Sequence, residues 1–252
     1  MVIRIGSSGI YTDSMLKLIK LPDLLSVCNA LFGFAAILLV LEGGSTRALK
    51  TALVFILVAT VIDGLDGFVA RTVESSPIGR YLDSLADMVS FGVAPAVVAF
   101  VVIKNFFPLT LTYTQVVVVS AFCGAYIICG MLRLARYNAK ISQQNEFVGL
   151  PITGSAILLA SFMLLAVELD IPCCAYILVI LMGFLCLFMI SRIQYRKLKN
   201  SWLVLISLIL FSALFFFYAV SLPLFVYPAA IIVVLTTLYI CSPVMHYLLN
   251  RA

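Results

Sequence analysis

The sequence predicts an all-α polytopic membrane protein, a bundle of about eight transmembrane helices. Apolar residues make up 64% of the 252 residues and charged residues only 11%, whereas a soluble domain is about half apolar and about a quarter charged. The apolar residues also form continuous runs of the length that crosses a bilayer, about 20 residues each. Together these observations exclude a disordered, disulfide-rich or ordinary soluble protein.

The first half of the chain contains four such runs. The first follows a mixed, polar N-terminal segment, the second and third are separated by a short polar connection, and the fourth ends in the basic sequence RLARYN. Apolar character sustained over this length predicts a membrane-spanning helix in each case. We expect these helices near residues 24–42, 48–70, 82–103 and 113–134.

The second half of the chain contains four more apolar runs. Pro151 opens the fifth run and is suited to the first turn of a helix. The acidic residues Glu168 and Asp170 end that run, and the basic segment RIQYRKLK follows the sixth. Pro223 and Pro228 divide the last apolar stretch, which is too long for one span. We expect helices near 150–169, 172–190, 202–220 and 224–242, and one membrane domain over 1–252 with no separate soluble part.

The basic residues indicate how the chain is oriented. Of the 16 Lys and Arg residues, all except Arg47, Lys50 and Lys104 fall in the terminal segments or the even-numbered loops. Cytoplasmic loops carry an excess of Lys and Arg. We therefore expect an integral protein of the cytoplasmic membrane, with both termini and the even-numbered loops in the cytoplasm.

Four aspartates lie in or at the edge of apolar helices. Asp63 and Asp66 are three residues apart near the end of the second run, and Asp83 and Asp87 are four apart at the start of the third. These spacings put each pair on one helix face. An ionisable residue inside the membrane costs at least about 2.5–3.5 kcal/mol, so such residues need partners. Because the connection is short, the helices can pack antiparallel with the four carboxylates converging.

This arrangement predicts a site for divalent cations. Carboxylate oxygens suit Mg²⁺, Mn²⁺ or Ca²⁺, and four carboxylates can hold the two ions that assist a phosphoryl displacement. Arg71 lies one helical turn further on and suits a phosphate group. Gly64, Gly67 and Gly79 would let a substrate approach the backbone closely. The alternatives are an Asp–Arg network that only holds helices together, or a conduction path for protons or cations.

The pattern resembles the signature of the CDP-alcohol phosphotransferases, D-x2-D-G-x2-A-R-x8-G-x3-D-x3-D. At its fixed positions the chain has Asp63, Asp66, Gly67, Ala70, Arg71, Gly79, Asp83 and Asp87. The chain departs from the signature in having seven residues, not eight, between Arg71 and Gly79. The shortening falls in the connecting turn, where a change of length is tolerated best.

The resemblance implies a CDP-alcohol phosphotransferase fold, with the catalytic core in residues 21–151 and further transmembrane helices in 152–252. It implies two divalent cations, Mg²⁺ or Mn²⁺, and a homodimer. The implied metal ligands are Asp63, Asp66, Asp83 and Asp87, and Asp87 is also the implied general base. The implied contacts to the CDP-linked lipid are Gly67, Ala70, Arg71 and Gly79.

Further segments resemble the branch of the family that uses serine, namely LPDLLSVCNALFGFAAI, SLADMVSFGVAPA, LRLARYNA and FVGLP. In the first of them Asp23 and Ser26 replace an Asn and a Thr. This resemblance implies transfer of a phosphatidyl group from CDP-diacylglycerol, or an archaeal CDP-ether lipid, to L-serine, giving phosphatidylserine and CMP. The implied partners are these substrates and membrane lipid, with no nucleic acid.

Arg133 and Arg136 are expected to bind the lipid phosphate or the serine carboxylate, because both lie at the cytoplasmic end of the fourth run, three residues apart. Simple anchoring at the membrane surface is the plainer interpretation of the pair.

Three other functions compete with serine transfer. The same fold could use glycerol phosphate or inositol as its acceptor. An intramembrane prenyltransferase also uses aspartates and Mg²⁺, but its two motifs would lie on helices that are not consecutive. A cation transporter would place its carboxylates near the middle of the bilayer, not beside Arg71 at the helix ends.

Overall fold

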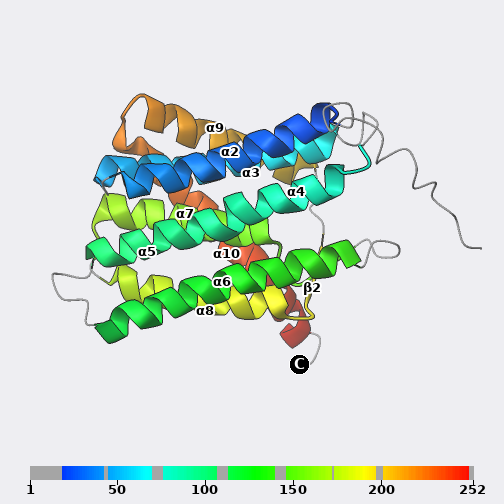
Figure 1. The fold of residues 1–252 in the computed structure, drawn as a ribbon. Helices are drawn as coiled ribbons and strands as arrows, with labels where there is room; N and C mark the ends of the chain where they lie inside the picture. The colour runs from blue at the N-terminus through cyan, green and yellow to red at the C-terminus, as the bar shows by residue number, and fades with distance from the viewer. Residues whose placement is uncertain are drawn as a thin grey trace, which may run out of the picture.

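Helices make up nearly all of the chain that the computed structural model describes, which is residues 19–42, 45–69, 76–106, 113–139, 146–171, 173–196 and 201–249. The helices run roughly side by side along one direction (Figure 1). They are α2 (Leu21–Leu41), α3 (Thr46–Val69), α4 (Gly79–Asp87), α5 (Ala94–Phe106), α6 (Tyr113–Ala139), α7 (Ile152–Leu169), α8 (Cys174–Ile190), α9 (Ser201–Ala219) and α10 (Val226–Leu249). A π-helical segment η1 (Met88–Val93) joins α4 to α5, and a short 3₁₀ turn η2 (Pro223–Phe225) precedes α10.

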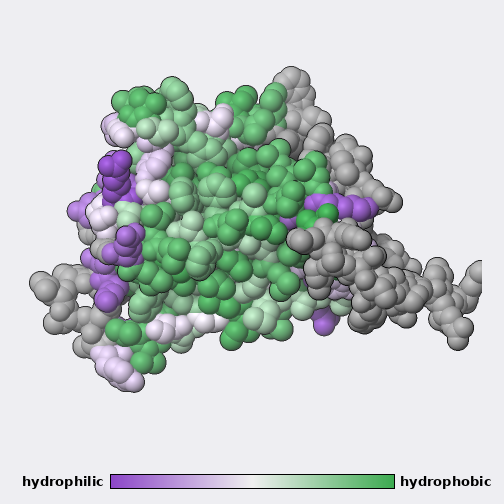
Figure 2. Space-filling view, turned by 45° about the horizontal axis from the view of Figure 1, so that its top comes forward, coloured by the Kyte–Doolittle hydropathy of each residue, from purple (hydrophilic) through white to green (hydrophobic). Residues whose placement is uncertain are grey.

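The predicted polytopic helical membrane fold is confirmed. Six helical stretches within the described residues are long and apolar enough to cross a membrane, and the apolar helices Cys174–Ile190 and Leu205–Ala219 are somewhat shorter. All eight coincide with the predicted runs. In the space-filling view a broad apolar band is flanked at both ends by hydrophilic residues, as a bilayer requires (Figure 2).

The predicted limits differ most for the last helix, which runs to Leu249, and they also differ for the third and fourth. The third begins at Gly79 and the fourth extends to Ala139, because polar residues at a helix end can leave the hydrocarbon while the backbone stays helical. As a result Arg80 and Arg136, which lie outside the predicted limits, are on regular helix rather than in loops.

The interior of the bundle is built on α3, α5 and α7. Leu53, Ile56 and Leu57 of α3 are fully buried, as are Leu159 and Leu164 of α7. α3 packs against α2 and α7, and α10 packs along the other side of α7. The helix that carries Asp63 and Asp66 therefore packs against protein along its middle, and its exposed residues among those described lie at its two ends.

The π-helical segment directly follows Asp87 and brings α2 very close. The Ser90 hydroxyl donates a hydrogen bond to the carbonyl oxygen of Asn29 (2.7 Å), and Gly33 lies one turn further along α2. A Cβ atom on Gly33 would be 2.6 Å from the Cα atom of Ser90. π-Helical turns are frequent at functional sites, and this one aligns polar residues of α2 with the start of α4.

A two-stranded antiparallel sheet lies beyond α6 and α8. It pairs β1 (Glu146–Val148) with β2 (Gln194–Arg196), so that Phe147 is opposite Tyr195. The two strands are far apart in the sequence, and the sheet therefore ties the segment before α7 to the segment before α9.

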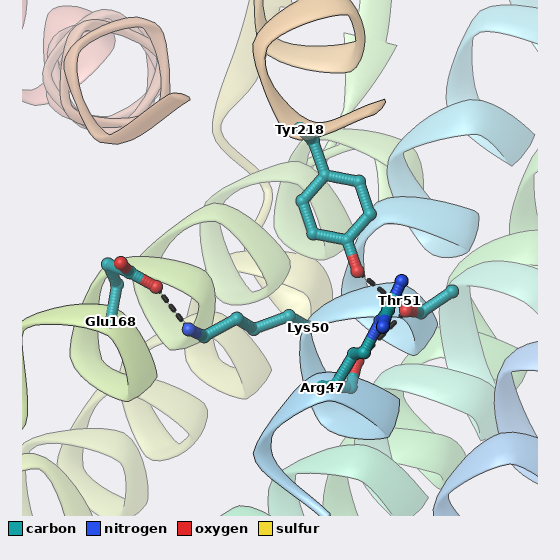
Figure 3. Close-up of polar contacts among 5 residues, drawn as sticks. All are labelled: Arg47, Lys50, Thr51, Glu168 and Tyr218. Atoms are coloured by element: carbon teal, nitrogen blue, oxygen red, sulfur yellow. Dashed lines mark hydrogen bonds and ion pairs between the residues drawn. The ribbon is translucent and has the colours of Figure 1, made fainter. Parts of the chain in front are cut away.

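Polar contacts close the opposite end of the bundle. Lys50 of α3 forms an ion pair with Glu168 of α7, and the hydroxyl groups of Thr51 and Tyr218 lie 2.6 Å apart in a hydrogen bond (Figure 3). The Thr51 hydroxyl also donates to the carbonyl oxygen of Arg47 (2.9 Å). These contacts join α3 to α7 and to α9, so α9 is attached to the core at this end.

We predict that Gly33→Ala destabilises the protein by about 1–3 kcal/mol, because the new methyl group would force α2 away from η1. This loss corresponds to a fall of several degrees in Tm, measured by thermal unfolding of the detergent-solubilised protein. Gly124→Ala is the matched control, because nothing lies within 4 Å of its Cβ position. Equal Tm values for the two variants would contradict the close packing of α2 on η1.

Candidate active site

Three of the four predicted aspartates form one cluster. Asp63 on α3 and Asp83 and Asp87 on α4 each present a carboxylate oxygen, and these three atoms lie within 4.8 Å of one another. Asp87 is buried, and Asp63 and Asp83 are partly buried. The i, i+4 spacing on α4 brings its two carboxylates to the face that meets α3, so the cluster depends on both helices.

Polar residues of α2 and α7 hold the cluster in place. The side-chain amide of Asn29 donates to Asp87 with an Nδ2–Oδ1 distance of 3.3 Å. Asp63 forms side-chain hydrogen bonds with Asp87 and with Thr153 at the start of α7. Asn29 belongs to the LPDLLSVCN segment, but the sequence alone assigned no role to Asn29 or Thr153, because their contacts join distant helices.

Asp66 lies one turn beyond Asp63 and is held separately from the cluster. Its carboxylate accepts a hydrogen bond of 2.5 Å from the Ser26 hydroxyl on α2, and its side chain is only 6% exposed. Ser26 therefore acts as the partner of an aspartate, a role that its resemblance to a family threonine did not reveal.

A cavity of about 380 Å³ opens beside these aspartates. Its walls come from the start of α2, the end of α3 and the start of α4: Pro22, Asp23, Ser26, Asp63, Asp66, Ser76, Pro77, Gly79, Arg80, Tyr81 and Asp83. Carboxylates line its floor, and the exposed side chains of Arg80 and Tyr81 stand at its mouth. Because cationic, aromatic and anionic groups meet here, the cavity suits a nucleotide with bound cations.

Close packing beside this cavity explains why position 79 is a glycine. A Cβ atom there would lie 2.8 Å from Oδ1 of Asp23, and the other carboxylate oxygen of Asp23 accepts the backbone N–H of Lys20 (2.7 Å). A side chain at position 79 would push away the start of α2 and fill part of the cavity.

The other three predicted contacts to the CDP-linked lipid lie at or beyond the end of α3. Gly67 lies within α3, and the predicted residues Ala70 and Arg71 lie outside the described residues.

Arg133 lies beside the aspartate cluster. It is buried on α6, with 7% exposure, and its guanidinium interacts electrostatically with Asp87 and Asp63. The Cζ atom lies 5.6 Å from the centre of the Tyr137 ring, a cation–π contact. A buried guanidinium next to a carboxylate cluster can bind an anionic group of a substrate there.

Arg136 is bound by the protein backbone. Its Nη1 atom donates to the carbonyl oxygens of Ile190 (3.1 Å) and Ser191 (3.2 Å). Its Nη2 atom donates to those of Val148 (2.7 Å) and Met189 (2.8 Å). The side chain thus joins the end of α6 to the end of α8 and to β1.

The backbone at Gly149 makes this contact possible. Its φ angle is +83°, a conformation that favours glycine, and a Cβ atom would lie 2.2 Å from Nη2 of Arg136. The FVGLP segment, which resembled the serine-using branch, therefore forms a tight junction around Arg136. Leu150 is fully buried beneath it.

The cluster fits a bound divalent cation. Two carboxyl groups that are close enough to share a hydrogen bond, as Asp63 and Asp87 are, repel each other unless a proton or a cation lies between them. Asp83 adds a third oxygen ligand from the adjacent turn. An all-oxygen set of this kind suits the hard cations Mg²⁺ and Mn²⁺.

Comparisons with known proteins agree with the resemblance in the sequence. Residues 19–189 match the model of the CDP-alcohol phosphatidyltransferase family. The chain is 35% identical to the archaetidylserine synthase of Methanothermobacter thermautotrophicus, over 72% of each chain. It is 37% identical to the CDP-diacylglycerol–serine O-phosphatidyltransferase of Methanocaldococcus jannaschii, over 74% of this chain and 79% of the other. It is 31% identical to the enzyme of that name from Bacillus subtilis, over 71% and 92%.

We predict that Mg²⁺ or Mn²⁺ stabilises the protein through the cluster. A ligand at about 100 times its Kd contributes about 2.7 kcal/mol, which is a rise in Tm of about 5–10 °C for a chain of this size. Asp83→Asn should remove most of the rise, because it deletes one anionic ligand. Asp170→Asn, an exposed change at the C-cap of α7, is the control. Equal Tm increases in both variants would place the cation elsewhere.

Proposed function

The chain belongs to the CDP-alcohol phosphatidyltransferase family, and we propose that it transfers the phosphatidyl group of a CDP-linked lipid to the hydroxyl of L-serine, releasing CMP. The observation that carries this proposal is the buried Arg133 beside the Asp63–Asp83–Asp87 cluster. The similarity to serine-specific relatives supports the same acceptor. The lipid is CDP-diacylglycerol or an archaeal CDP-ether lipid, which present the same diphosphate to the protein.

The cavity between α2, α3 and α4 receives the CDP group. Its position next to the aspartates supports this assignment, since the diphosphate has to meet the cations. By the family signature, Gly67, Ala70, Arg71 and Gly79 contact the CDP-linked lipid. Arg80, at the mouth of the cavity, adds a second positive charge for the phosphates.

The aspartates hold the metal. Asp63, Asp66, Asp83 and Asp87 are the proposed ligands of two divalent cations, Mg²⁺ or Mn²⁺. When bound, the cations neutralise the diphosphate and stabilise the departing CMP. Ser26 and Asn29 keep the carboxylates of Asp66 and Asp87 in fixed orientations.

Asp87 acts as the general base. Its carboxylate takes the proton of the serine hydroxyl while the hydroxyl oxygen attacks the phosphorus that carries the lipid, and the bond from that phosphorus to CMP breaks. The hydrogen bond from Asn29 fixes the carboxylate on one side, and burial among α2, α4 and α6 keeps bulk water from competing as the acceptor.

Arg133 binds the carboxylate of serine. In serine the carboxylate and the hydroxyl are separated by only two carbon atoms, so one substrate can meet both Arg133 and Asp87. The cluster itself is anionic and can accommodate the ammonium group. The Arg136 guanidinium donates hydrogen bonds to four backbone carbonyl oxygens. We therefore assign Arg136 to positioning the end of α6, not to contacting the acceptor.

The proposed location follows from the distribution of charge. The aspartate cluster lies at the end of the bundle that also carries Arg133 and Arg136, and the positive-inside rule puts this end in the cytoplasm. We propose that the enzyme lies in the cytoplasmic membrane with both termini in the cytoplasm. Its partners are its substrates and membrane lipid, with no nucleic acid. By the family resemblance, we also propose that it forms a homodimer.

We expect the purified protein to release CMP from CDP-diacylglycerol when L-serine is supplied, and EDTA to abolish the release until Mg²⁺ or Mn²⁺ is added in excess. CMP release with sn-glycerol 3-phosphate and with inositol is measured in parallel, at matched concentrations. Faster release with either of these acceptors would contradict serine as the acceptor, while full activity in EDTA would contradict the role of the cations.

We expect Arg133→Lys to lower kcat/KM for serine by about 10- to 150-fold, because a charge-assisted hydrogen bond contributes about 1.5–3 kcal/mol and an ammonium group cannot bind a carboxylate in the bidentate way. The KM for the CDP-lipid should stay unchanged. Arg192→Lys, at an exposed position after α8, is the control. An increase confined to the CDP-lipid KM would instead assign Arg133 to the lipid phosphate.

A further inference from the structure

The π-helical segment η1 joins the aspartates of α4 to α5 within one nearly continuous rod (Figure 1). The backbone N–H of Ala94, at the end of η1, donates to the carbonyl oxygen of Val89, five residues earlier rather than four. This turn therefore accommodates one residue more than a turn of α-helix, and one residue rotates an α-helix by about 100°. The direction of Asp83 and Asp87 relative to α5 consequently depends on η1 remaining π-helical.

The rotation of α5 is fixed by the core of the bundle. Val98, Ala99 and Val102 are fully buried, and α5 packs against α3, α6, α7 and α8. If η1 became α-helical, α5 could not turn without exposing these side chains, so the short helix α4 would turn instead, by about 100°. Its two carboxylates would then leave the face that meets Asp63 on α3. The π-helical turn is therefore a condition for the aspartate cluster.

Two side-chain hydroxyl groups join η1 to the neighbouring helices. Tyr126 on α6 is fully buried, and its hydroxyl donates to the carbonyl oxygen of Phe91 (3.1 Å). The Ser90 hydroxyl donates to the carbonyl oxygen of Asn29 on α2 (2.7 Å), and the Asn29 amide donates to Asp87. Irregular backbone persists inside a membrane protein where neighbouring helices supply its hydrogen bonds. Helices α2 and α6 therefore both stabilise the π-helical turn.

We propose that Tyr126 is a positioning residue for the aspartate cluster: its hydrogen bond to Phe91 keeps η1 π-helical, and η1 directs Asp83 and Asp87 toward Asp63. Tyr126 belongs to none of the motifs found in the sequence. The proposal rests on the metal-binding part of the proposed function. A cation bound by all three carboxylates favours the aligned state by itself, so the Tyr126 hydroxyl matters most when cations are scarce.

The Tyr126 hydroxyl could instead only stabilise the bundle, because a buried tyrosine hydroxyl usually has a hydrogen-bond partner. A second tyrosine separates the two roles. Tyr218 on α9 also joins two helices, through a hydrogen bond of 2.6 Å with the Thr51 hydroxyl on α3. Thr51 precedes Asp63 by about three turns of α3. Removing either tyrosine hydroxyl weakens helix packing, but only the Tyr126 hydroxyl is bonded to η1.

The test compares Mn²⁺ binding by the wild type, Tyr126→Phe and Tyr218→Phe, as full-length, detergent-purified proteins well below their Tm values. Free Mn²⁺ is measured by its electron paramagnetic resonance signal. We expect Tyr126→Phe to raise the Kd for Mn²⁺ about three- to tenfold, the effect of losing one hydrogen bond, because a smaller fraction of the protein has its aspartates aligned. Tyr218→Phe should leave this Kd unchanged and lower only the Tm.

A second measurement follows CMP release from CDP-diacylglycerol and L-serine, both saturating, as Mn²⁺ is varied. The Mn²⁺ concentration for half-maximal release should rise in Tyr126→Phe by the same factor as the Kd, and excess Mn²⁺ should restore kcat to within about twofold of the wild type.

An unchanged Kd in Tyr126→Phe, or equal changes in the two variants, would overturn the inference and leave the proposed function intact. A Kd that rises only in Tyr126→Phe, in a protein whose wild type releases no CMP with serine, would support the inference and overturn the proposed function. No Mn²⁺ binding by the wild type would overturn the proposed metal site and the inference with it.

Discussion

The burial of several carboxylates inside an apolar bundle is the constraint on which this structure depends. Asp63, Asp83 and Asp87 lie close together in a region that is otherwise packed with aliphatic side chains. Bringing like charges together away from water is unfavourable unless cations or hydrogen-bond donors compensate. The surrounding helices supply those donors, and the family chemistry supplies the cations. What would be destabilising in an ordinary core is thus the feature that we propose binds a diphosphate.

The helix contacts around the cluster follow from this need. Helix α2 presents Ser26 and Asn29, one turn apart, to Asp66 and Asp87, and Gly33 allows α2 to lie against the π-helical turn after α4. The same approach brings Asp23 against Gly79 at the edge of the cavity. The glycines thus allow α2 to pack closely against α4 and the π-helical turn, and the polar residues of α2 are then near enough to form hydrogen bonds with the carboxylates.

Two arginines one turn apart on α6 have different roles: one is proposed to bind substrate, and the other holds neighbouring segments of the protein together. Arg133 lies beside the aspartates, whereas Arg136 binds the backbone of two other segments, the end of α8 and β1. Gly149 has to be glycine because Arg136 passes directly over it. The end of α6 that carries Arg133 is consequently fixed by a junction that includes the small sheet, whose second strand lies beyond the part of the chain that matches the family model.

The sequence by itself determined the fold class, the eight helices, the family and the positions of the aspartates, because hydrophobic length and the i, i+3 and i, i+4 spacings are local properties of the chain. Only the tertiary structure decided which of these side chains meet. Asp66 accepts a hydrogen bond from Ser26 while the other three aspartates form the cluster, and Asn29 and Thr153 join the site from distant helices. Arg133 and Arg136 look equivalent in sequence, but a helix turns by about 100° per residue and their neighbours differ. Helix packing, which depends on contacts between residues far apart in the chain, therefore decided their roles.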